Sequence, residues 1–317
     1  MSNGVYIGID TSNYTTSLAI LDQRGELVAN LKKPLPVKEG ERGLRQSDAL
    51  FNHTVNIPPL MNEAKKYLEN MKPLAIGVST RPRNVEGSYM PCFLAGISVA
   101  ESIAAFSGAH LYRFSHQCGH IMAAIYSSRE YSLLDREFCA LHLSGGTTEI
   151  LKVKYQNGEF LADICGGTKD LSAGQLIDRV GVYLGLPFPS GAHLEKLALQ
   201  NTKPLTKTKL AISSTYANFS GAENMAINLY TKTKDSAYTA HFVLDYIGRT
   251  ICKMLFAYAE QHGSSPFLFA GGVMCNSIIK AMVSENREAY FAEPSMSADN
   301  AVGIAALAMR KYKMENN

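Results

Sequence analysis

The chain has 317 residues, of which 46% are hydrophobic and 19% are charged, and its formal net charge is +3 at pH 7. Such a chain is long enough for two domains and apolar enough to bury a sizeable core, as a globular protein does. The small net charge does not demand a nucleic-acid partner, although it permits a local basic patch.

Six cysteines are scattered along the chain without any C-x-x-C pair, which excludes a zinc ribbon and a disulfide framework. We therefore expect reduced, mostly buried thiols in a cytoplasmic protein. No apolar run approaches the roughly 18 residues of a transmembrane helix. No basic segment followed by a long apolar run opens the chain, so no secretory signal is expected.

Two apolar runs lie near the start of the chain, over residues 5–12 and 15–21, and a corner of small polar residues joins them. This pattern predicts a β-hairpin. Residues 26–35 are expected to add a third strand. Basic residues then cluster between 32 and 45, where they could contact a polyanion or simply face solvent.

The next segments predict a helix, a strand, a second helix and a second strand. Helical spacing over residues 47–69 is interrupted by two adjacent prolines at 58 and 59, which are expected to break or kink the helix. Residues 74–80 are typical of a buried strand. Arg81 and Arg83 follow at its carboxyl end, which faces the ligand crevice in open α/β sheets. An apolar helix from Pro91 and a strand over 109–114 come next.

Two histidines four residues apart follow that strand. Ser115 can cap a helix that carries His116 and His120 on one face. Imidazoles placed in this way can bind one divalent metal, and they can equally be two ordinary histidines at a helix start. No glutamate follows His116, so the H-E-x-x-H logic of a metalloprotease does not apply.

A second strand, corner and strand lie over residues 141–153, with Ser144, Gly145, Gly146 and Thr147 at the corner. The corner can be a plain tight turn or a nest of backbone N–H groups that holds a phosphate. Because it repeats the pattern of the first hairpin, we predict a duplicated α/β domain. The arrangement resembles the two-lobed actin-like ATPase fold of actin, sugar kinases and Hsp70. We expect one lobe over 1–130, completed by a helix over 299–317, and a second lobe over 131–298.

The second half also predicts helices over 172–184, 220–230 and 236–262. Asp178 lies on the first of these helices, where it could accept a hydrogen bond from a ribose hydroxyl or simply face solvent. A strand over 267–270 precedes two glycines, which could let an adenine ring lie against the backbone. Asp299 stands before the last helix, which it could cap, or it could complete a site with the two histidines. A further basic segment contains Lys203, Lys207 and Lys209.

Eight short motifs, in collinear order over nearly the whole chain, resemble the pattern of the TsaD/Gcp family, once called O-sialoglycoprotein endopeptidases. Members are threonylcarbamoyl transferases of tRNA modification. The family pattern contains G-I-E-T-S, H-x-x-x-H, S-G-G, A-G-E-x-x-D, P-G-G, F-S-G, G-G-V-x-x-N and C-T-D-N. The matching positions here are residues 8–12, His116 with His120, 144–146, 173–178, 189–191, 219–221, 271–276 and 299–300.

The resemblance implies roles for these residues. His116, His120 and Asp299 would bind one Fe²⁺ or Zn²⁺, and such a set leaves positions open for substrate. The residues that would line the phosphate of an adenylate are Leu143, Ser144, Gly145, Gly146 and Thr147. Its ribose and adenine would be held by Asp178, Gly191 and Asn276.

The chain also departs from the family pattern, and these departures bear on the substrate and on catalysis. Two acidic groups of the family segment C-D-E-T are missing, because residues 13–16 are Asn-Tyr-Thr-Thr. The family's G-P-G is Arg-Pro-Arg at 81–83, and its S-G-G-H ends in Thr147. Gln175 stands where the family has glutamate, Leu171 replaces an aspartate, and Glu223 replaces a lysine.

The resemblance implies transfer of a threonylcarbamoyl group from threonylcarbamoyl-adenylate to N6 of an adenosine next to the tRNA anticodon, assisted by the metal. Bound nucleotide would be that adenylate, or ATP or AMP. Companion proteins would include a catalytically silent paralogue and a P-loop ATPase. No membrane partner is expected. Candidate tRNA phosphate contacts are Arg81, Arg83, Lys203, Lys207 and Lys209. Alternatives are a carbamoyl or acyl transferase with another acceptor, a non-catalytic nucleotide-binding scaffold, and a sugar or acetate kinase.

Overall fold

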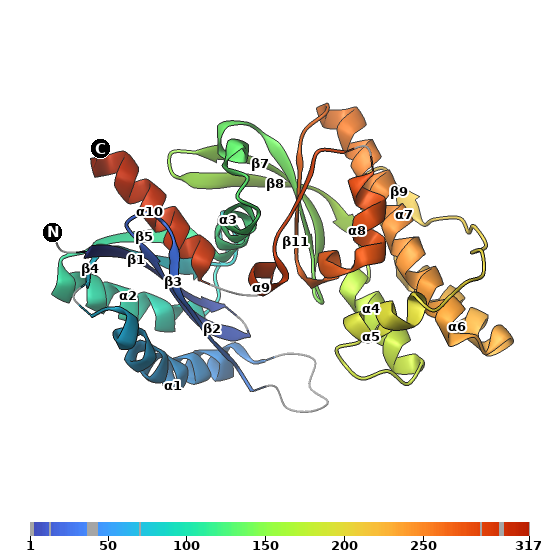
Figure 1. The fold of residues 1–317 in the computed structure, drawn as a ribbon, viewed down its shortest axis with the longest axis horizontal. Helices are drawn as coiled ribbons and strands as arrows, with labels where there is room; N and C mark the ends of the chain where they lie inside the picture. Colours follow the sequence, from blue (N-terminus) through green and yellow to red (C-terminus); the bar gives the residue numbers. More distant parts are fainter. Residues whose placement is uncertain are drawn as a thin grey trace. The chain divides into compact units, whose positions relative to one another are not determined.

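The computed structural model describes residues 3–12, 14–36, 44–69, 71–285, 287–297 and 301–316. The chain forms two compact units, which are described separately (Figure 1). Unit 1 comprises Met1–Ser132, Tyr155–Leu161 and Ser295–Asn317, and unit 2 comprises Leu133–Lys154 and Ala162–Pro294. The inclusion of residues 155–161 in unit 1 had no signal in the sequence.

Unit 1 is built on a five-stranded sheet in the order β3-β2-β1-β4-β5. The predicted hairpin is confirmed, because β1 pairs antiparallel with β2 and the pairing runs out to Ser12 and Thr15. On its other side β1 pairs parallel with β4, which pairs parallel with β5. The strands are β1 (Asn3–Ser12), β2 (Thr15–Asp22), β3 (Leu27–Pro34), β4 (Met71–Arg81) and β5 (His110–Ser115).

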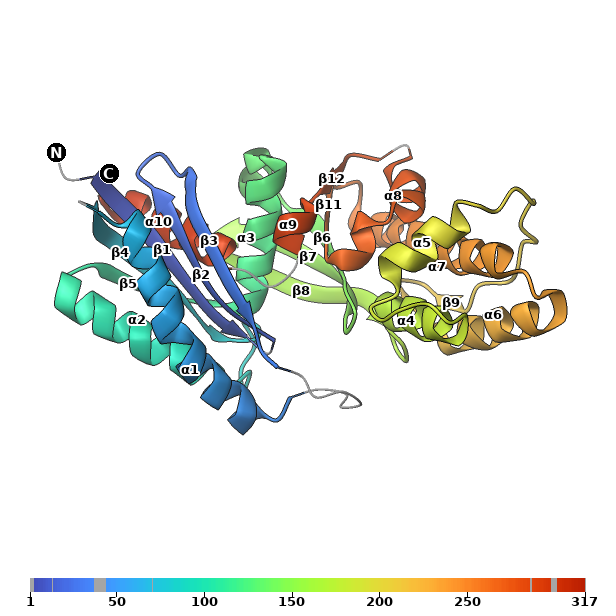
Figure 2. The same ribbon diagram turned by 60° about the horizontal axis from the view of Figure 1, so that its bottom comes forward.

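Helices cover both faces of this sheet (Figure 2). The α2 residue Gly96 packs against Ile9 and Thr11, whereas α10 packs against Gly8, which points to the opposite face of β1. A Cβ on Gly8 would collide with the backbone of α10, so sheet and helix meet at main-chain distance. The helices are α1 (Gln46–Ala64), α2 (Phe93–Ser107), α3 (His116–Ser128), α9 (Pro294–Ser297) and α10 (Val302–Asn316), with short 3₁₀ turns η1 (Lys65–Tyr67) and η2 (Tyr131–Asp135).

Of the break or kink expected at the two prolines, the break is not found, because α1 continues through Pro58 and Pro59. Both prolines are exposed, on the face of α1 that carries Thr54 and Val55, which are exposed too. A proline at position i frees the carbonyl at i−4, and here the freed carbonyls belong to Thr54 and Val55. Since solvent can satisfy these carbonyls, the apolar side of α1 can hold the helix together.

Unit 2 contains a seven-stranded sheet in the order β12-β11-β6-β7-β8-β10-β9. The second predicted hairpin is confirmed, since β6 and β7 pair antiparallel. β11 pairs parallel with both β6 and β12. The strands are β6 (Phe138–Leu143), β7 (Thr148–Gln156), β8 (Glu159–Thr168), β9 (Ile212–Ser213), β10 (Tyr216–Ala217), β11 (Phe267–Ala270) and β12 (Ala289–Phe291).

The helices of unit 2 supply most of its core. α7 buries Tyr246 and Tyr258 completely, together with the apolar stripe that its sequence predicts. β8 continues to Thr168, close to Asp170 and the start of α4. The helices are α4 (Ala173–Tyr183), α5 (Gly191–Ala198), α6 (Ser220–Thr233), α7 (Ser236–His262) and α8 (Ser277–Ser284), with the 3₁₀ turn η3 (Gly272–Cys275). Among the described residues, no helix is both long and apolar enough to cross a membrane.

Candidate functional site

The end of β1 carries a carboxylate that water does not reach. Asp10 has no exposed surface, and the hydroxyl of Ser12 donates to its Oδ2 over 2.7 Å. The hydroxyl of Ser17, on the paired strand, donates to the main-chain oxygen of Asp10 over 3.3 Å. The next residue, Thr11, accepts a hydrogen bond from the backbone N–H of Gly96 on α2. These contacts fix the strand end, and with it the position of the carboxylate.

The start of α3 presents the two histidines that the sequence singled out. Ser115 caps the helix as predicted, since its hydroxyl accepts from the backbone N–H of Cys118 over 3.2 Å. Nδ1 of His116 lies 3.0 Å from Oδ1 of Asp10, and Nε2 of His116 lies 2.9 Å from Nε2 of His120. The expected convergence of the two imidazoles is confirmed, and Asp10 is a partner that the spacing did not indicate.

This pair of rings fits a metal. Two imidazole nitrogens that bind one ion at about 2.1 Å are about 3.4 Å apart at the tetrahedral angle of a zinc site, and about 3.0 Å apart at the right angle of an octahedral site. The 2.9 Å between Nε2 of His116 and Nε2 of His120 is close to the second of these values. A carboxylate on the outer nitrogen of a ligating histidine is a recurrent feature of metal sites.

The third proposed ligand, Asp299, lies outside the described residues, so its role stays a prediction. Within the described part of the chain, no group of three His, Cys, Asp or Glu side chains is arranged to hold a metal. The described residues therefore bring together two imidazole nitrogens and one carboxylate, and a three-ligand metal site would need a further group.

In unit 2, the corner between β6 and β7 is closed by two local hydrogen bonds. The N–H of Ser144 donates to the carbonyl of Thr147 over 2.8 Å, and the N–H of Thr147 donates to the hydroxyl of Ser144 over 3.1 Å. Gly145 and Gly146 at the tip are accessible to solvent, and a Cβ on either would meet nothing within 4 Å. The corner therefore offers two accessible peptide units to a phosphate.

The N-terminus of α4 packs directly beneath this corner. The hydroxyl of Ser172 donates to the carbonyl of Gly145 over 2.8 Å, and the N–H of Ala173 donates to the hydroxyl of Thr148 over 2.8 Å. A Cβ on Gly174 would come within 2.5 Å of the Ser144 carbonyl, so only glycine allows this approach. The positive end of the α4 dipole thus lies next to the place where a phosphate would bind.

Gly271 and Gly272, which follow β11, lie in different surroundings. Gly271 has a φ of +95°, and a Cβ there would collide with the carbonyl of Leu143. Gly272 is exposed, and a Cβ at that position would meet nothing within 4 Å. Asn276 is buried and caps α8 by accepting from the N–H of Ile279 over 3.1 Å. Its amide nitrogen is the group that could still reach an adenine.

Asp178 serves the loop that precedes α5. Its Oδ1 accepts from the N–H of Ser190 over 2.7 Å. Burial raises the pKa of this carboxyl, and the Ser190 hydrogen bond opposes the increase. Gly191 begins α5, and no atom lies within 4 Å of a Cβ built on it. The contact that the structure shows for Asp178 therefore holds this loop in place through Oδ1. Its other oxygen, Oδ2, is the one that could face a ribose.

The candidate tRNA contacts fall into two groups. In unit 1, the Arg81 guanidinium donates to Thr80 over 3.2 Å and to Asn84 over 2.8 Å, so it is already oriented by neighbours. Arg83 is half-buried. An arginine held in this way loses little additional conformational freedom on meeting a phosphate.

In unit 2, Lys203 forms an ion pair with Asp235 over 2.6 Å, which weakens its case as a phosphate contact. Lys207 and Lys209 are both exposed. Lys209 lines a groove of about 580 Å³ together with Arg249. These two lysines are the better candidates for a polyanion.

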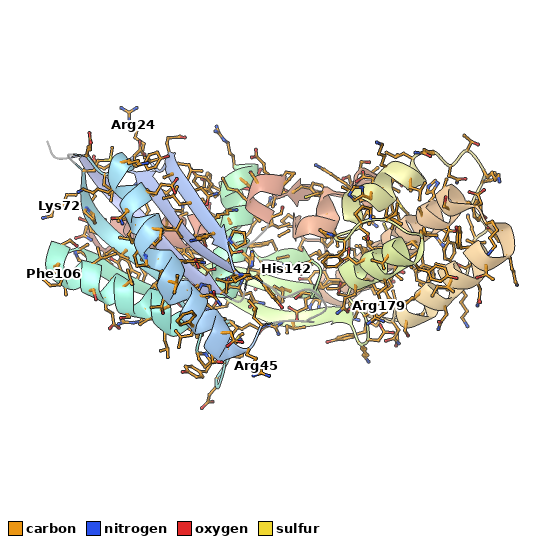
Figure 3. All side chains as sticks on the ribbon, turned by 90° about the horizontal axis from the view of Figure 1, so that it is seen from below. Arg24, Arg45, Lys72, Phe106, His142 and Arg179 are labelled. Carbon is orange, nitrogen blue, oxygen red and sulfur yellow. The ribbon has the colours of Figure 1, made fainter. Side chains whose placement is uncertain are left out.

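Two residues at which the chain departs from the family pattern have structural partners. Gln175 forms a reciprocal capping box with Ser172. Glu223 forms an ion pair with Arg179 over 3.2 Å, at the surface of α4 (Figure 3).

Asp170, the acidic residue that matches the family pattern, holds the start of α6. Its carboxylate accepts from the N–H groups of Phe219, Ser220 and Leu171. Partial burial alone would raise the pKa of this carboxyl, but the hydrogen bonds from Ser220, Phe219 and Leu171 outweigh it and lower the pKa.

A comparison with models of protein families shows to which family the chain belongs. The family model TsaD, described as tRNA N6-adenosine threonylcarbamoyltransferase, matches residues 37–306. The chain belongs to the TsaD family.

Relatives with the same description support this assignment. This family member is 28% identical to the tRNA N6-adenosine threonylcarbamoyltransferase of Halalkalibacterium halodurans, over 98% of this chain and 91% of that protein. It is also 28% identical to the Streptococcus suis protein of the same name, over 100% of this chain and 95% of that protein.

Solved structures show that the predicted fold class is correct. HypF of T. kodakarensis has a TM-score of 0.63 at 12% identity, with coverage of 99% of this chain and 48% of that one. Component A of the (R)-2-hydroxyglutaryl-CoA dehydratase of Acidaminococcus fermentans has a TM-score of 0.57 at 18% identity, with coverage of 98% and 99%. A glucokinase of the ROK family from Streptomyces griseus has a TM-score of 0.54 at 12% identity, with coverage of 97% and 100%. This TsaD family member therefore has the α/β actin-like fold that sugar kinases share.

Proposed function

We propose that this chain transfers a threonylcarbamoyl group from threonylcarbamoyl-adenylate to N6 of an adenosine next to the tRNA anticodon. The observation that supports the proposal most directly is the family match over residues 37–306. The close approach of Nε2 in His116 and His120 is independent support, since kinases of this fold do not need such a pair.

In the proposed reaction, the exocyclic N6 amine attacks the carbamoyl carbonyl carbon. A nitrogen–carbon bond forms, the bond from that carbon to the phosphate oxygen breaks, one proton leaves N6, and AMP departs. The target base lies in a single-stranded loop, where it can be turned outward at low cost. A bound Fe²⁺ or Zn²⁺ would supply Lewis acidity toward the carbonyl.

Residues of this chain would hold the reactants. His116 and His120 would bind the metal, with Asp299 as the predicted carboxylate ligand. The accessible tip at Gly145 and Gly146, above the amino end of α4, would bind the adenylate phosphate. Other residues proposed to hold the nucleotide are Leu143, Ser144, Thr147, Asp178, Gly191, Gly272 and Asn276.

Basic residues on both units would bind the tRNA backbone. Lys207 and Lys209 in unit 2 are accessible to solvent, and Arg81 in unit 1 is already oriented by neutral partners. Arg83 lies two residues further along the loop that follows β4. Phosphate contacts of this kind make binding salt-dependent. The companion proteins proposed for the reaction are a silent paralogue and a P-loop ATPase.

Mass spectrometry of tRNA nucleosides tests the proposal. The strain should carry this gene as its only family member, with an empty vector and the His120→Ala variant as controls. Threonylcarbamoyl-adenosine should be present with the wild-type gene and absent with the empty vector. If the modified nucleoside is missing while the protein is folded and its companions are present, the proposed acceptor is wrong.

A second candidate is a nucleotide-binding paralogue without catalysis. The observation that favours it is the structural use of positions where the family carries other groups, since Gln175 caps a helix and Glu223 pairs with Arg179. Purified protein that binds ATP or AMP, yet gives no product with threonylcarbamoyl-adenylate and tRNA in the presence of the companions, would favour this candidate.

A further inference from the structure

The carboxylate of Asp10 is a fully buried charged group beside the histidine pair. It has no exposed surface, and its two oxygens contact different partners. Oδ2 accepts from the Ser12 hydroxyl over 2.7 Å, and Oδ1 lies 3.0 Å from Nδ1 of His116. Removing a carboxylate from water is costly, so a buried one is retained where its partners need it.

The hydrogen-bond directions along this chain of groups follow from their chemistry. A carboxylate can only accept, so the proton between Asp10 and His116 belongs to Nδ1 of His116. In a neutral ring, Nε2 then carries a lone pair, and that lone pair points toward Nε2 of His120, 2.9 Å away. The deprotonated Nε2 is also the form in which an imidazole binds a metal.

We infer that Asp10 is the positioning residue of the metal site, which fixes the tautomer and the ring orientation of His116. This inference rests on the metal in the proposed function. In this role Asp10 acts through its contact with Nδ1 of His116 and not as a metal ligand. Residues in this position typically contribute about 10- to 100-fold to metal affinity, because they orient the ligand and increase its basicity.

The surroundings of Asp10 support a dedicated position. The strand end is fixed from the opposite side by Thr11, which accepts from the N–H of Gly96. The ring of Phe93 packs at 6.3 Å from the ring of His116, so the imidazole has an apolar neighbour. Burial raises the pKa of the Cys92 thiol to about 11, and the charge of the nearby Asp10 carboxylate adds to this increase.

Three variants separate this role from a general contribution to folding. Asp10→Asn keeps the shape and removes the charge, and Ser12→Ala removes the hydroxyl that orients Oδ2. Ser17→Ala is the matched control, because it removes a hydrogen bond to the main-chain oxygen of Asp10 and leaves the carboxylate contacts alone. The thermal midpoint of each metal-free protein reports on folding.

Two measurements are made on each full-length variant. The first is NMR of the imidazole nitrogens in metal-free protein, which gives the tautomer of His116. The second is titration with Zn²⁺ and with Co²⁺ in competition with a chelating dye, in which the Co²⁺ spectrum also reports the ligand geometry. We expect Nδ1–H in the wild type and in Ser17→Ala, with equal metal affinities.

For Asp10→Asn we expect loss of the single tautomer and a metal affinity about 10- to 100-fold lower. For Ser12→Ala we expect a smaller loss that still exceeds the effect of Ser17→Ala. A wild-type tautomer and an affinity within about twofold in Asp10→Asn would overturn the inference. Should Asp10→Asn fail to fold, Ser12→Ala decides, and equality with Ser17→Ala overturns the inference.

A failure of the proposed function can be distinguished from a failure of the inference about Asp10. If the wild type binds neither metal, the proposed metal is wrong. The tautomer of His116 in the metal-free proteins then still decides whether Asp10 positions the ring.

Discussion

Nε2 of His116 and Nε2 of His120 lie 2.9 Å apart on consecutive turns of α3. Two lone pairs at this distance repel each other, and so do two N–H groups. The pair is stable when one nitrogen donates a hydrogen bond to the other, or when both nitrogens bind one cation. The position of a single proton or ion is therefore central to the chemistry of this site.

Replacing either histidine by alanine should remove the metal. We expect His116→Ala and His120→Ala to lower the Fe and Zn content of protein purified without chelators by at least about tenfold, because one remaining imidazole is a weak site. Elemental analysis by mass spectrometry measures the content per chain. The stability of His120→Ala should stay near that of the wild type, since this side chain is partly exposed. His116→Ala should be less stable, because it removes a partner of the buried Asp10 carboxylate.

His262→Ala is the control for this experiment, because His262 is exposed at the end of α7 in unit 2. It removes one histidine of the chain and should leave the metal content unchanged. Wild-type metal content in both His116→Ala and His120→Ala would show that the ion, if present, is held elsewhere.

The adjacent glycines Gly271 and Gly272 should respond to substitution in opposite ways. Gly271→Ala places a methyl group against the carbonyl of Leu143 at a φ of +95°. We expect it to lower the free energy of unfolding by about 2–4 kcal/mol. Gly272→Ala meets no atom within 4 Å and should change it by less than about 0.5 kcal/mol. Urea unfolding measures both.

Gly272→Ala, which should leave the stability unchanged, should affect the binding of AMP. We expect Gly272→Ala to weaken AMP binding, measured by calorimetry, because the added methyl group occupies the exposed surface proposed for the adenine. Full AMP affinity in Gly272→Ala would exclude that surface. A stability of Gly271→Ala equal to that of Gly272→Ala would contradict the close packing at Leu143.

Asp170 should make the stability depend on pH. Its pKa is lowered below the ordinary value of 3.8, so the ionised form favours the folded state. The stabilisation is present above that ordinary value and is lost as the pH falls through it toward the folded-state pKa. We expect Asp170→Ala to cost about 1 kcal/mol at pH 7, as the loss of a helix cap does, and less at about pH 3.

Chemical unfolding of wild type and Asp170→Ala at a series of pH values measures this difference. Asp170→Asn keeps one acceptor oxygen and should fall between the two proteins at pH 7. Curves for the wild type and the alanine variant that run parallel down to acid pH would contradict the role of the charge.

Gln175→Glu restores the residue of the family pattern and should be tolerated. Glutamate can complete the same capping box with Ser172, and a negative charge in the first turn of α4 stabilises a helix by about 0.3–1 kcal/mol. We expect a slightly higher thermal midpoint. Threonylcarbamoyl transfer in vitro, measured alongside, shows whether the family's glutamate also contributes to activity.

A lower thermal midpoint for Gln175→Glu would contradict the capping role. Gln175→Ala is the matched variant that loses the side-chain half of the box, and it should be less stable than both other proteins.

Much of this fold could be predicted because its signals are local. Apolar runs joined by corners of small residues predict the two hairpins, and the Ser115 cap predicts where α3 begins. The continuous α1 could not be predicted, since only burial shows that Pro58 faces solvent.

The candidate site was predictable in part for the same reason. His116 and His120 are four residues apart on one helix, so their convergence follows from helix geometry alone. Asp10 is 106 positions away from His116, and no periodicity connects a strand end with a distant helix start. Likewise, the contacts of Asp170 with α6 cross about 50 positions.

The packing of α10 on β1 also affects how the protein is made. Gly8 and Gly77 bring the first and fourth strands against a helix that begins at Val302. A ribosome therefore exposes the sheet of unit 1 long before the helix that covers it, and synthesises all of unit 2 in the interval. Until that helix is synthesised, the apolar face of the sheet can associate with other chains, so we expect the yield to depend on chaperones.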